Sequence, residues 1–236
     1  MKILLNPEFE SLRTFVESIP QVFDKEGRTI YKSRNEIKVF HVNGKEFNVK
    51  RYKIPIFINR IIYTFIRKPK GLRAFSYPEK LLAKGVNTPC PVAYIEIKEW
   101  GLIHYSFFIS EQSPYTHVLY EFGNAKFDDY KEVAIAFAKF TAKVHELGVY
   151  HLDYSPGNIL FEKIDGEYSF SLVDINRMRF KKVDIKTGCA NFARLWGSDQ
   201  LFELIAKEYA EARGFNQEEC LRLVFEARKK FTKRMG

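Results

Sequence analysis

The stretch HLDYSPGNIL, residues 151–160, places a histidine, an aspartate and an asparagine at fixed offsets directly ahead of an apolar pair. These are His151, Asp153 and Asn158, and a Pro-Gly turn lies between the last two. A second aspartate, Asp174, ends the segment YSFSLVDIN, which reads as a strand. Carboxylate and amide oxygens suit a hard metal ion and the phosphates that it binds. The sequence therefore predicts a site for metal and phosphate around one short hairpin.

The elements ahead of this site read as a small β-rich lobe over residues 1–111 with one principal helix. The runs EIKVFHV and KEFNVKRYK are joined by Asn43-Gly44, which favours a two-residue type I′ hairpin. The run PVAYIEIKEWGLIHYSFFISEQ predicts two more strands, and SYPEKLLAKGV predicts the helix, ended by Gly85. A helix near PEFESLRTFVESI and a strand near RTIYKS are expected before them.

The second half, residues 112–236, has helical periodicity. DDYKEVAIAFAKFTAKVHELGV carries an apolar stripe with a period of 3.6 residues. GCANFARLWGSDQLFELIAKEYAEARG, broken near Gly197, and NQEECLRLVFEARKKF, capped by Asn216, are the expected final helices. The chain is thus predicted to be an α+β protein, one domain of two lobes divided between residues 111 and 112.

Composition restricts the setting. The 236 residues, of which 46% are hydrophobic, can bury a full core. Cys90, Cys189 and Cys220 have no disulfide or metal spacing, so we expect reduced thiols in a cytoplasmic location. The N-terminus lacks the apolar run of a signal peptide. The longest apolar run, IPIFINRIIYTFI, is interrupted by Asn59 and Arg60 and is shorter than the roughly 18 residues of a spanning helix, so no membrane span is expected.

The net charge of +9 is unevenly placed. Between Phe47 and Pro78 there are eight basic residues and no acidic one, interleaved with Tyr, Phe and Ile. This stretch is either a solvated face or a surface for nucleic acid, an anionic membrane, or a phosphorylated or carboxylated substrate. Nucleic acid is the weakest of these alternatives and we expect none, because no RNP-like or helix-turn-helix pattern accompanies the stretch.

The segment HLDYSPGNIL resembles the H-x-D-x-x-x-x-N catalytic loop of the protein-kinase fold, and VDIN resembles its D-F-G segment. The resemblance implies a bilobal protein-kinase-like fold that uses ATP and Mg²⁺. In it, Asp153 accepts the proton of an attacking hydroxyl, and Asp174 with Asn158 ligates Mg²⁺. His151 is expected to brace the loop rather than to react.

The same fold implies a lysine that positions the phosphates. Lys50, on the strand in FNVKRYK, lies about a hundred residues before the catalytic loop and is our choice, with Lys53 as the alternative. Glu79 is the only carboxylate between residues 47 and 95 and is the expected partner of this lysine, unless Ser76 occupies that position one turn earlier. Glu111, which ends SFFISE, is a further candidate for nucleotide binding.

Departures from the protein-kinase pattern narrow the resemblance. No G-x-G-x-x-G precedes the hairpin, Ile-Asn replaces Phe-Gly after Asp174, and no A-P-E follows. FNVKRYK, RAFSYPEKLLAKGVNTPCPVAYIE, SFFISE, HLDYSPGNIL and LVDINRMRF look like the bacterial lipopolysaccharide core kinases, the heptose kinase and 3-deoxy-D-manno-octulosonic acid kinase family. This similarity covers roughly residues 30–200.

The family resemblance implies an ATP-dependent kinase that phosphorylates a sugar hydroxyl of the inner-core glycolipid on the cytoplasmic side of the inner membrane. The acceptor is then an anionic glycolipid, and the basic stretch makes a peripheral contact with the anionic membrane surface. Two other classes stay open. One is a phosphotransferase with another small-molecule or protein acceptor. The other is a catalytically silent module that holds nucleotide or an acidic glycan, which the missing glycine-rich loop favours and the retained site residues oppose.

Overall fold

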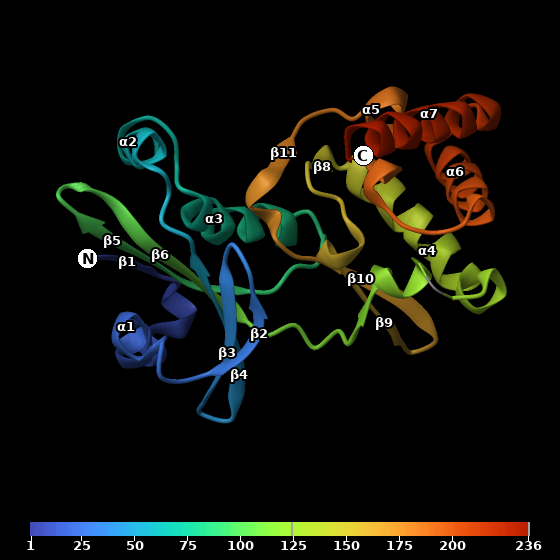
Figure 1. Ribbon diagram of the computed structural model, residues 1–236. Coiled ribbons are helices and arrows are strands. Elements are labelled where there is room, and N and C mark those ends of the chain that lie inside the picture. Colours follow the sequence, from blue (N-terminus) through green and yellow to red (C-terminus); the bar gives the residue numbers. More distant parts are fainter. Residues whose placement is uncertain (124, 236) are drawn as a thin grey trace. The chain divides into compact units, whose positions relative to one another are not determined.

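The structure, a computed structural model, describes residues 1–123 and 125–235 and divides into two compact units (Figure 1). Unit 1 contains Met1–Lys80 and Thr88–Pro114, and unit 2 contains Leu81–Asn87 and the chain from Tyr115 onward. The division thus falls three residues after the one expected from the sequence, and a short upstream segment joins unit 2. That segment is held there by the Leu172 N–H, which donates to the Asn87 carbonyl at 2.9 Å.

Unit 1 is built on a six-stranded antiparallel sheet in the order β1-β5-β6-β4-β3-β2. The type I′ hairpin is confirmed, because Asn43 and Gly44 have φ values of 51° and 76° between paired strand ends. The strands are β1 (Lys2–Leu5), β2 (Arg28–Lys32), β3 (Glu36–Val42), β4 (Lys45–Tyr52), β5 (Pro91–Glu99) and β6 (Leu102–Glu111).

Helices cover both faces of this sheet (Figure 1). On one face, α1 (Arg13–Val22), which follows the 3-10 turn η1 (Pro7–Leu12), packs Val16 and Ile19 into the core with residues of β4, β5 and β6. On the other face, α3 (Lys70–Leu82) approaches closely through Gly71, where a Cβ would lie 2.7 Å from the Tyr94 ring. Only glycine allows this approach.

Two elements of unit 1 were not expected from the sequence. β1 adds a strand beside β5, and α2 (Phe57–Phe65) forms within the basic stretch. α3 also begins six residues before the helix expected from SYPEKLLAKGV. None of the residues of α2 is buried, so its apolar run forms a surface helix and not part of the core.

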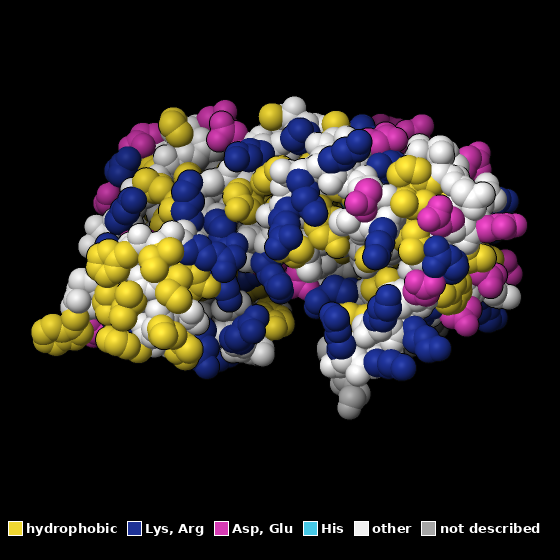
Figure 2. Space-filling model, turned by 90° about the horizontal axis from the view of Figure 1, so that it is seen from above, with side chains coloured by type: hydrophobic (Ala, Val, Ile, Leu, Met, Phe, Trp, Pro, Cys, Tyr) yellow, Lys and Arg dark blue, Asp and Glu magenta, His cyan; other side chains and the backbone are white. Residues whose placement is uncertain are grey.

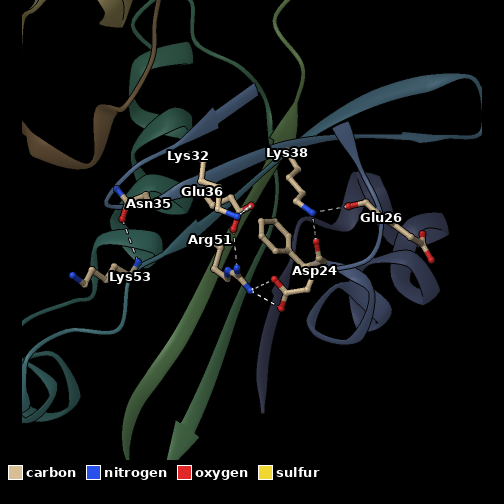
Figure 3. Close-up of polar contacts among 9 residues, drawn as sticks. Asp24, Glu26, Lys32, Asn35, Glu36, Lys38, Arg51 and Lys53 are labelled. Atoms are coloured by element: carbon tan, nitrogen blue, oxygen red, sulfur yellow. Dashed lines mark hydrogen bonds and ion pairs between the residues drawn. The ribbon is translucent and has the colours of Figure 1, made fainter. Parts of the chain in front are cut away.

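A polar cluster ties the loop after α1 to strands β3 and β4 (Figure 3). The Arg51 guanidinium bonds Glu36 at 2.7 Å and Asp24 at 2.9 Å, and this bond holds the pKa of the Asp24 carboxyl below its usual value. The buried Lys38 ammonium donates to the carbonyls of Phe23 and Glu26 at 2.6 and 3.1 Å. The cation thus satisfies the Phe23 carbonyl at the C-terminal end of α1, where the helix dipole favours it, and the Glu26 carbonyl in the loop that follows.

We expect Lys38→Met to lower the free energy of unfolding by about 1–3 kcal/mol, because two carbonyls lose a charged donor. Urea denaturation measures this loss. Lys32→Met is the matched control, since the Lys32 side chain is exposed and its ammonium forms a surface ion pair with Glu36 at 3.5 Å, and it should change stability by less than about 0.5 kcal/mol. Equal losses in the two variants would show that the bonds of Lys38 contribute nothing.

Unit 2 is mainly helical and has small sheets at one side of its helices. α4 (Phe127–Glu146) forms the centre, with Phe137 and Ala138 fully buried, and α6 (Asp199–Arg213) packs against it. The remaining helices are α5 (Ile185–Asn191) and α7 (Gln217–Met235), with the 3-10 turns η2 (Leu119–Gly123), η3 (Pro156–Asn158), η4 (Ile175–Arg177) and η5 (Phe192–Arg194). The strands are β7 (His117–Val118), β8 (Val149–His151), β9 (Ile159–Ile164), β10 (Glu167–Leu172) and β11 (Met178–Phe180).

The expected break near Gly197 is present, because the chain leaves η5 at Arg194 and α6 begins after Ser198, whose hydroxyl accepts from the Leu201 N–H. Asn216 caps α7 as expected, accepting from the Glu219 N–H at 2.8 Å. In the described part of the chain, no helix combines the length and apolar character needed to cross a lipid bilayer.

Candidate active site

The catalytic-loop segment of unit 2 is fixed by a buried histidine. His151 ends β8, and its Nδ1 accepts from the Asp153 N–H at 3.0 Å. The proton of the neutral ring must therefore be on Nε2, which donates to the Val173 carbonyl at 3.1 Å. Burial lowers the pKa of His151, so the neutral ring is the stable form. The side chain holds the loop in shape, as expected from the sequence.

A second buried histidine supports the same segment from behind. The Asn191 amide donates to the His151 carbonyl at 2.9 Å and accepts from His145 Nε2 at 3.0 Å. The other ring nitrogen of His145 lies 2.9 Å from the Tyr209 hydroxyl. Helices α4, α5 and α6 are thereby bonded to β8, and the backbone at the start of the loop has little freedom.

The Asp153 carboxylate lies between two arginines. Arg194 Nη2 is 2.8 Å from Oδ1, and Arg177 Nη1 is 3.5 Å from Oδ2. The Asp153 carbonyl accepts from Ser155 N and from Asn158 Nδ2, both at 2.8 Å. A closed turn therefore carries Asp153, and one arginine side chain lies beside each of its carboxylate oxygens.

Asn158 and Asp174 lie on adjoining segments of unit 2. The Val173 N–H donates to the Asn158 carbonyl at 3.0 Å and joins the two segments just before Asp174. Because Asn158 Nδ2 bonds the Asp153 carbonyl, its Oδ1 is the atom that suits a cation. The strand β10 ends at Leu172, two residues before Asp174, whereas the sequence predicted a strand that ends on Asp174. The Asp174 carboxylate accepts a hydrogen bond from Asn176 Nδ2.

The backbone at Asp174 is left-handed, with φ 52° and ψ 41°. Among the described residues, three other non-glycine residues have positive φ, and each begins a hairpin turn ahead of a glycine: Asn43, Trp100 and Asp165. Asp174 has no such turn. A left-handed residue outside a turn costs free energy, and such residues cluster at functional sites.

The donor set of unit 2 fits a hard cation with few protein ligands. Residues 1–123 and 125–235 contain no group of three or more His, Cys, Asp or Glu side chains that could hold a metal. Asp174 and Asn158 offer one carboxylate and one amide oxygen. This is the kind of set that binds Mg²⁺ together with nucleotide phosphates and water, and it is unlike a closed zinc cage.

The predicted phosphate lysine belongs to unit 1. Lys50 lies within β4, on the face of the strand opposite Phe47 and Val49, with its Nζ 5.4 Å from the Tyr52 ring. The alternative, Lys53, lies beyond the end of β4, is exposed, and donates its backbone N–H to Asn35. A lysine in the strand is held more firmly than one after it, so Lys50 stays the better candidate.

The expected acidic residues of unit 1 are placed less favourably. Glu79 is exposed on α3 and makes no hydrogen bond or ion pair that the described residues show, so its pairing with Lys50 stays a prediction. Ser76 donates to the Leu72 carbonyl within its own helix at 2.8 Å. Glu111 ends β6, and its carboxylate is 3.8 Å from Lys45 Nζ. Its role in nucleotide binding also stays a prediction.

Sequence reasoning missed Arg177, Arg194 and Asn191. Arg177 lies three residues after Asp174 in the VDINRM segment, so its spacing was a usable signal. Arg194 and Asn191 are about forty residues beyond the loop that they contact, and they reach it only because α5 and η5 fold back on β8. No local pattern could have found them.

Comparisons with known proteins identify the family and the fold of this chain. The family model described as the lipopolysaccharide kinase (Kdo/WaaP) family matches residues 20–221. Among solved structures, the chain is similar to that of "WaaP in complex with acyl carrier protein", with a TM-score of 0.65, 18% sequence identity and coverage of 99% of each chain. A search of curated proteins gave no match.

The fold is protein-kinase-like, with a β-rich unit and a mainly helical unit, as the catalytic-loop resemblance predicted. Because the family model spans most of its length, the chain belongs to the lipopolysaccharide kinase (Kdo/WaaP) family. It is therefore a kinase of lipopolysaccharide core biosynthesis, and this membership implies the use of ATP and a lipopolysaccharide acceptor.

The buried histidines should make stability depend on pH. Burial lowers the pKa of His145 to about 4 from 6.5. Between these values the unfolded chain binds a proton that the folded chain does not, so stability is complete above the unfolded pKa and falls as the pH drops towards 4. We expect a loss of about 2 kcal/mol between pH 7 and pH 5 from this group, with His151 adding in the same direction.

Denaturant titrations at pH 7 and pH 5 measure this difference. In His145→Gln the change in the free energy of unfolding between pH 7 and pH 5 should be smaller by about 2 kcal/mol. His41→Gln, a control at an exposed histidine, should leave this change as it is in the wild type. An undiminished difference in His145→Gln would assign the pH dependence to other groups.

Proposed function

We propose that this kinase transfers the γ-phosphoryl group of ATP to a sugar hydroxyl of the lipopolysaccharide inner core, on heptose or 3-deoxy-D-manno-octulosonic acid. Asp153 is the base that accepts the hydroxyl proton. Asp174 and Asn158 hold Mg²⁺, and Lys50 binds the α- and β-phosphates, with Glu79 and Glu111 as further contacts on the nucleotide side. The observation that carries this proposal is the geometry of Asp153.

That geometry supports transfer to an anionic acceptor. The closed turn at Asp153 fixes the backbone that carries its carboxylate, and a fixed carboxylate is what a positioned base requires. Arg194 and Arg177 place two positive charges at the same point. A simple alcohol does not need them, whereas the carboxylate or phosphate of an inner-core sugar gains charge-assisted hydrogen bonds from guanidinium groups.

The metal role rests on the chemistry of the donors. Mg²⁺ would draw together the phosphate oxygens and neutralise the charge that develops during transfer. The left-handed backbone at Asp174 and its bond from Asn176 fix the carboxylate, and the bond between Asn158 and the Asp153 carbonyl fixes the amide. These residues are thus oriented in advance, which is how a protein contributes most to phosphoryl transfer.

The acceptor also bears on the location of the enzyme. A glycolipid substrate is anchored in a bilayer, so we propose a cytoplasmic enzyme that makes a peripheral contact with the anionic inner membrane. Of the basic residues between Phe47 and Pro78, the exposed Lys53, Arg67 and Lys68 support this contact, because each basic residue near an anionic surface contributes roughly 1 kcal/mol. The similar WaaP structure contains an acyl carrier protein, and a partner of that kind is a second proposal for this chain.

The first experiment is transfer of labelled phosphate from ATP to purified inner-core glycolipid, with Asp174→Asn beside the wild type. Turnover should fall by at least about 100-fold, because the carboxylate that holds the metal is lost. Asp165→Asn is the matched control, since Asp165 is also a left-handed aspartate, with φ 51°, but lies in the β9–β10 turn. Full activity in Asp174→Asn would remove the metal assignment.

Asp153→Asn tests the base. We expect turnover to fall by roughly 100- to 10,000-fold while ATP affinity changes by less than about threefold, because the carboxylate acts on the acceptor hydroxyl. Single-turnover kinetics and nucleotide-binding calorimetry separate these two quantities. A proportionate loss of ATP affinity would instead make Asp153 part of the nucleotide site.

A further inference from the structure

The surface helix α2 turns its apolar side chains towards solvent. Its polar residues face the protein instead: Arg60 Nε donates to the Ile103 carbonyl at 2.8 Å, and the Thr64 hydroxyl accepts from the Ile103 N–H at 3.1 Å. A helix on a soluble domain normally buries its apolar stripe and exposes its polar one. Here hydrogen bonds to β6 hold the helix, and the apolar stripe is left without a partner in unit 1.

The stripe is large. Phe57, Ile61 and Phe65 recur at intervals of four residues and so lie along one side of the helix. Figure 2 shows hydrophobic side chains gathered over α2 on this face of the molecule. Their exposed fractions are 68% for Ile56, 68% for Phe57, 62% for Ile58, 74% for Phe65 and 79% for Ile66. A contiguous patch of this kind marks an interaction surface.

Positive charge adjoins the patch. Arg67 and Lys68 follow α2 directly and are exposed, and Lys53 precedes it, whereas residues 47–78 contain no acidic residue. Figure 2 shows Lys and Arg side chains beside the hydrophobic cluster. An apolar surface bordered by cations complements a layer of acyl chains beneath anionic headgroups.

Two neighbouring features extend this surface. A groove of about 510 Å³ at the end of α2 has apolar walls that include Phe65, Ile66 and Leu72. Its charged lining is mostly cationic, with Arg67, Lys68 and Lys98 beside one carboxylate, Glu96. Trp100, 92% exposed, lies at the tip of the β5–β6 hairpin, next to Glu99, whose carbonyl accepts from Arg60. Tryptophan is the side chain that favours the interface between headgroups and acyl chains.

We propose that α2 is a membrane-inserting helix: its apolar stripe enters the interfacial layer of an anionic bilayer, and Arg67 and Lys68 bind the lipid phosphates. A nine-residue helix is far too short to cross the bilayer and lies along its surface. The inference deepens the proposed peripheral contact by naming the element that makes it. It rests on unit 1 alone, so vesicle binding can fail while phosphate transfer to a lipid-free acceptor succeeds, or the reverse.

The experiment is co-sedimentation of the full chain with vesicles of phosphatidylcholine alone and of phosphatidylcholine mixed with phosphatidylglycerol. The wild type should bind the mixed vesicles and bind the neutral ones much more weakly. Phe57→Gln with Phe65→Gln should weaken binding at least about tenfold, because two large apolar side chains leave the bilayer. Ile30→Gln with Ile164→Gln removes two exposed apolar residues elsewhere and should bind as the wild type does.

Vesicle binding at low and high salt separates the electrostatic contribution of the cations from the insertion of the apolar side chains. Arg67→Gln with Lys68→Gln should weaken binding to mixed vesicles by roughly tenfold or more at low salt, and its difference from the wild type should shrink at high salt, because two of the cations are lost and salt screens the rest. The paired phenylalanine variant should keep a weak binding that salt removes. All variants lie on the surface, and an unchanged melting temperature confirms their folding.

Two results would overturn the proposal. The first is a wild type that does not bind mixed vesicles. The second is a paired phenylalanine variant that binds them as the wild type does, and if this variant also loses binding to purified acyl carrier protein, the α2 patch is an interface for a protein partner instead.

Discussion

The buried imidazole of His151 is the contact on which the candidate site depends. It receives a hydrogen bond from the Asp153 backbone and gives one to Val173, so a single neutral ring fixes the loop that carries the proposed base and the segment that leads to Asp174. Burial keeps the ring neutral, and neutrality is what lets one nitrogen accept while the other donates. The network through Asn191 and His145 then anchors this ring to the helical core.

A rigid loop alone does not select an acceptor, and in the proposed function the arginines beside Asp153 supply the charge that does. They come from η4 and η5, two short turns on different parts of unit 2. Their convergence on Asp153 places two guanidinium groups beside the proposed base. The acceptor sugar that we propose, which carries its own negative charge, would meet these cations at the point of transfer.

In unit 1, the helices α1 and α2 place their apolar side chains in opposite environments. α1 buries Val16 and Ile19 against the sheet and stabilises the fold, whereas α2 keeps Phe57 and Phe65 in solvent and is held by hydrogen bonds to β6. Exposing such side chains lowers solubility and gives nothing to the core, so the arrangement is consistent with a surface that meets lipid. The same basic stretch thus carries both the charge and the apolar contact.

The sequence by itself determined most of the elements and the class of enzyme. Alternating and helical periodicities predicted the hairpins and the long helices, since these patterns reflect which side of an element is buried, and the spacing of His151, Asp153 and Asn158 predicted the fold and the kinase activity. Only the tertiary structure decided that Arg194 reaches Asp153, that Glu79 is exposed, and that the apolar run of α2 faces outward. Contacts between distant segments depend on how the helices pack, and a local pattern does not reveal whether an apolar stripe meets the core or solvent.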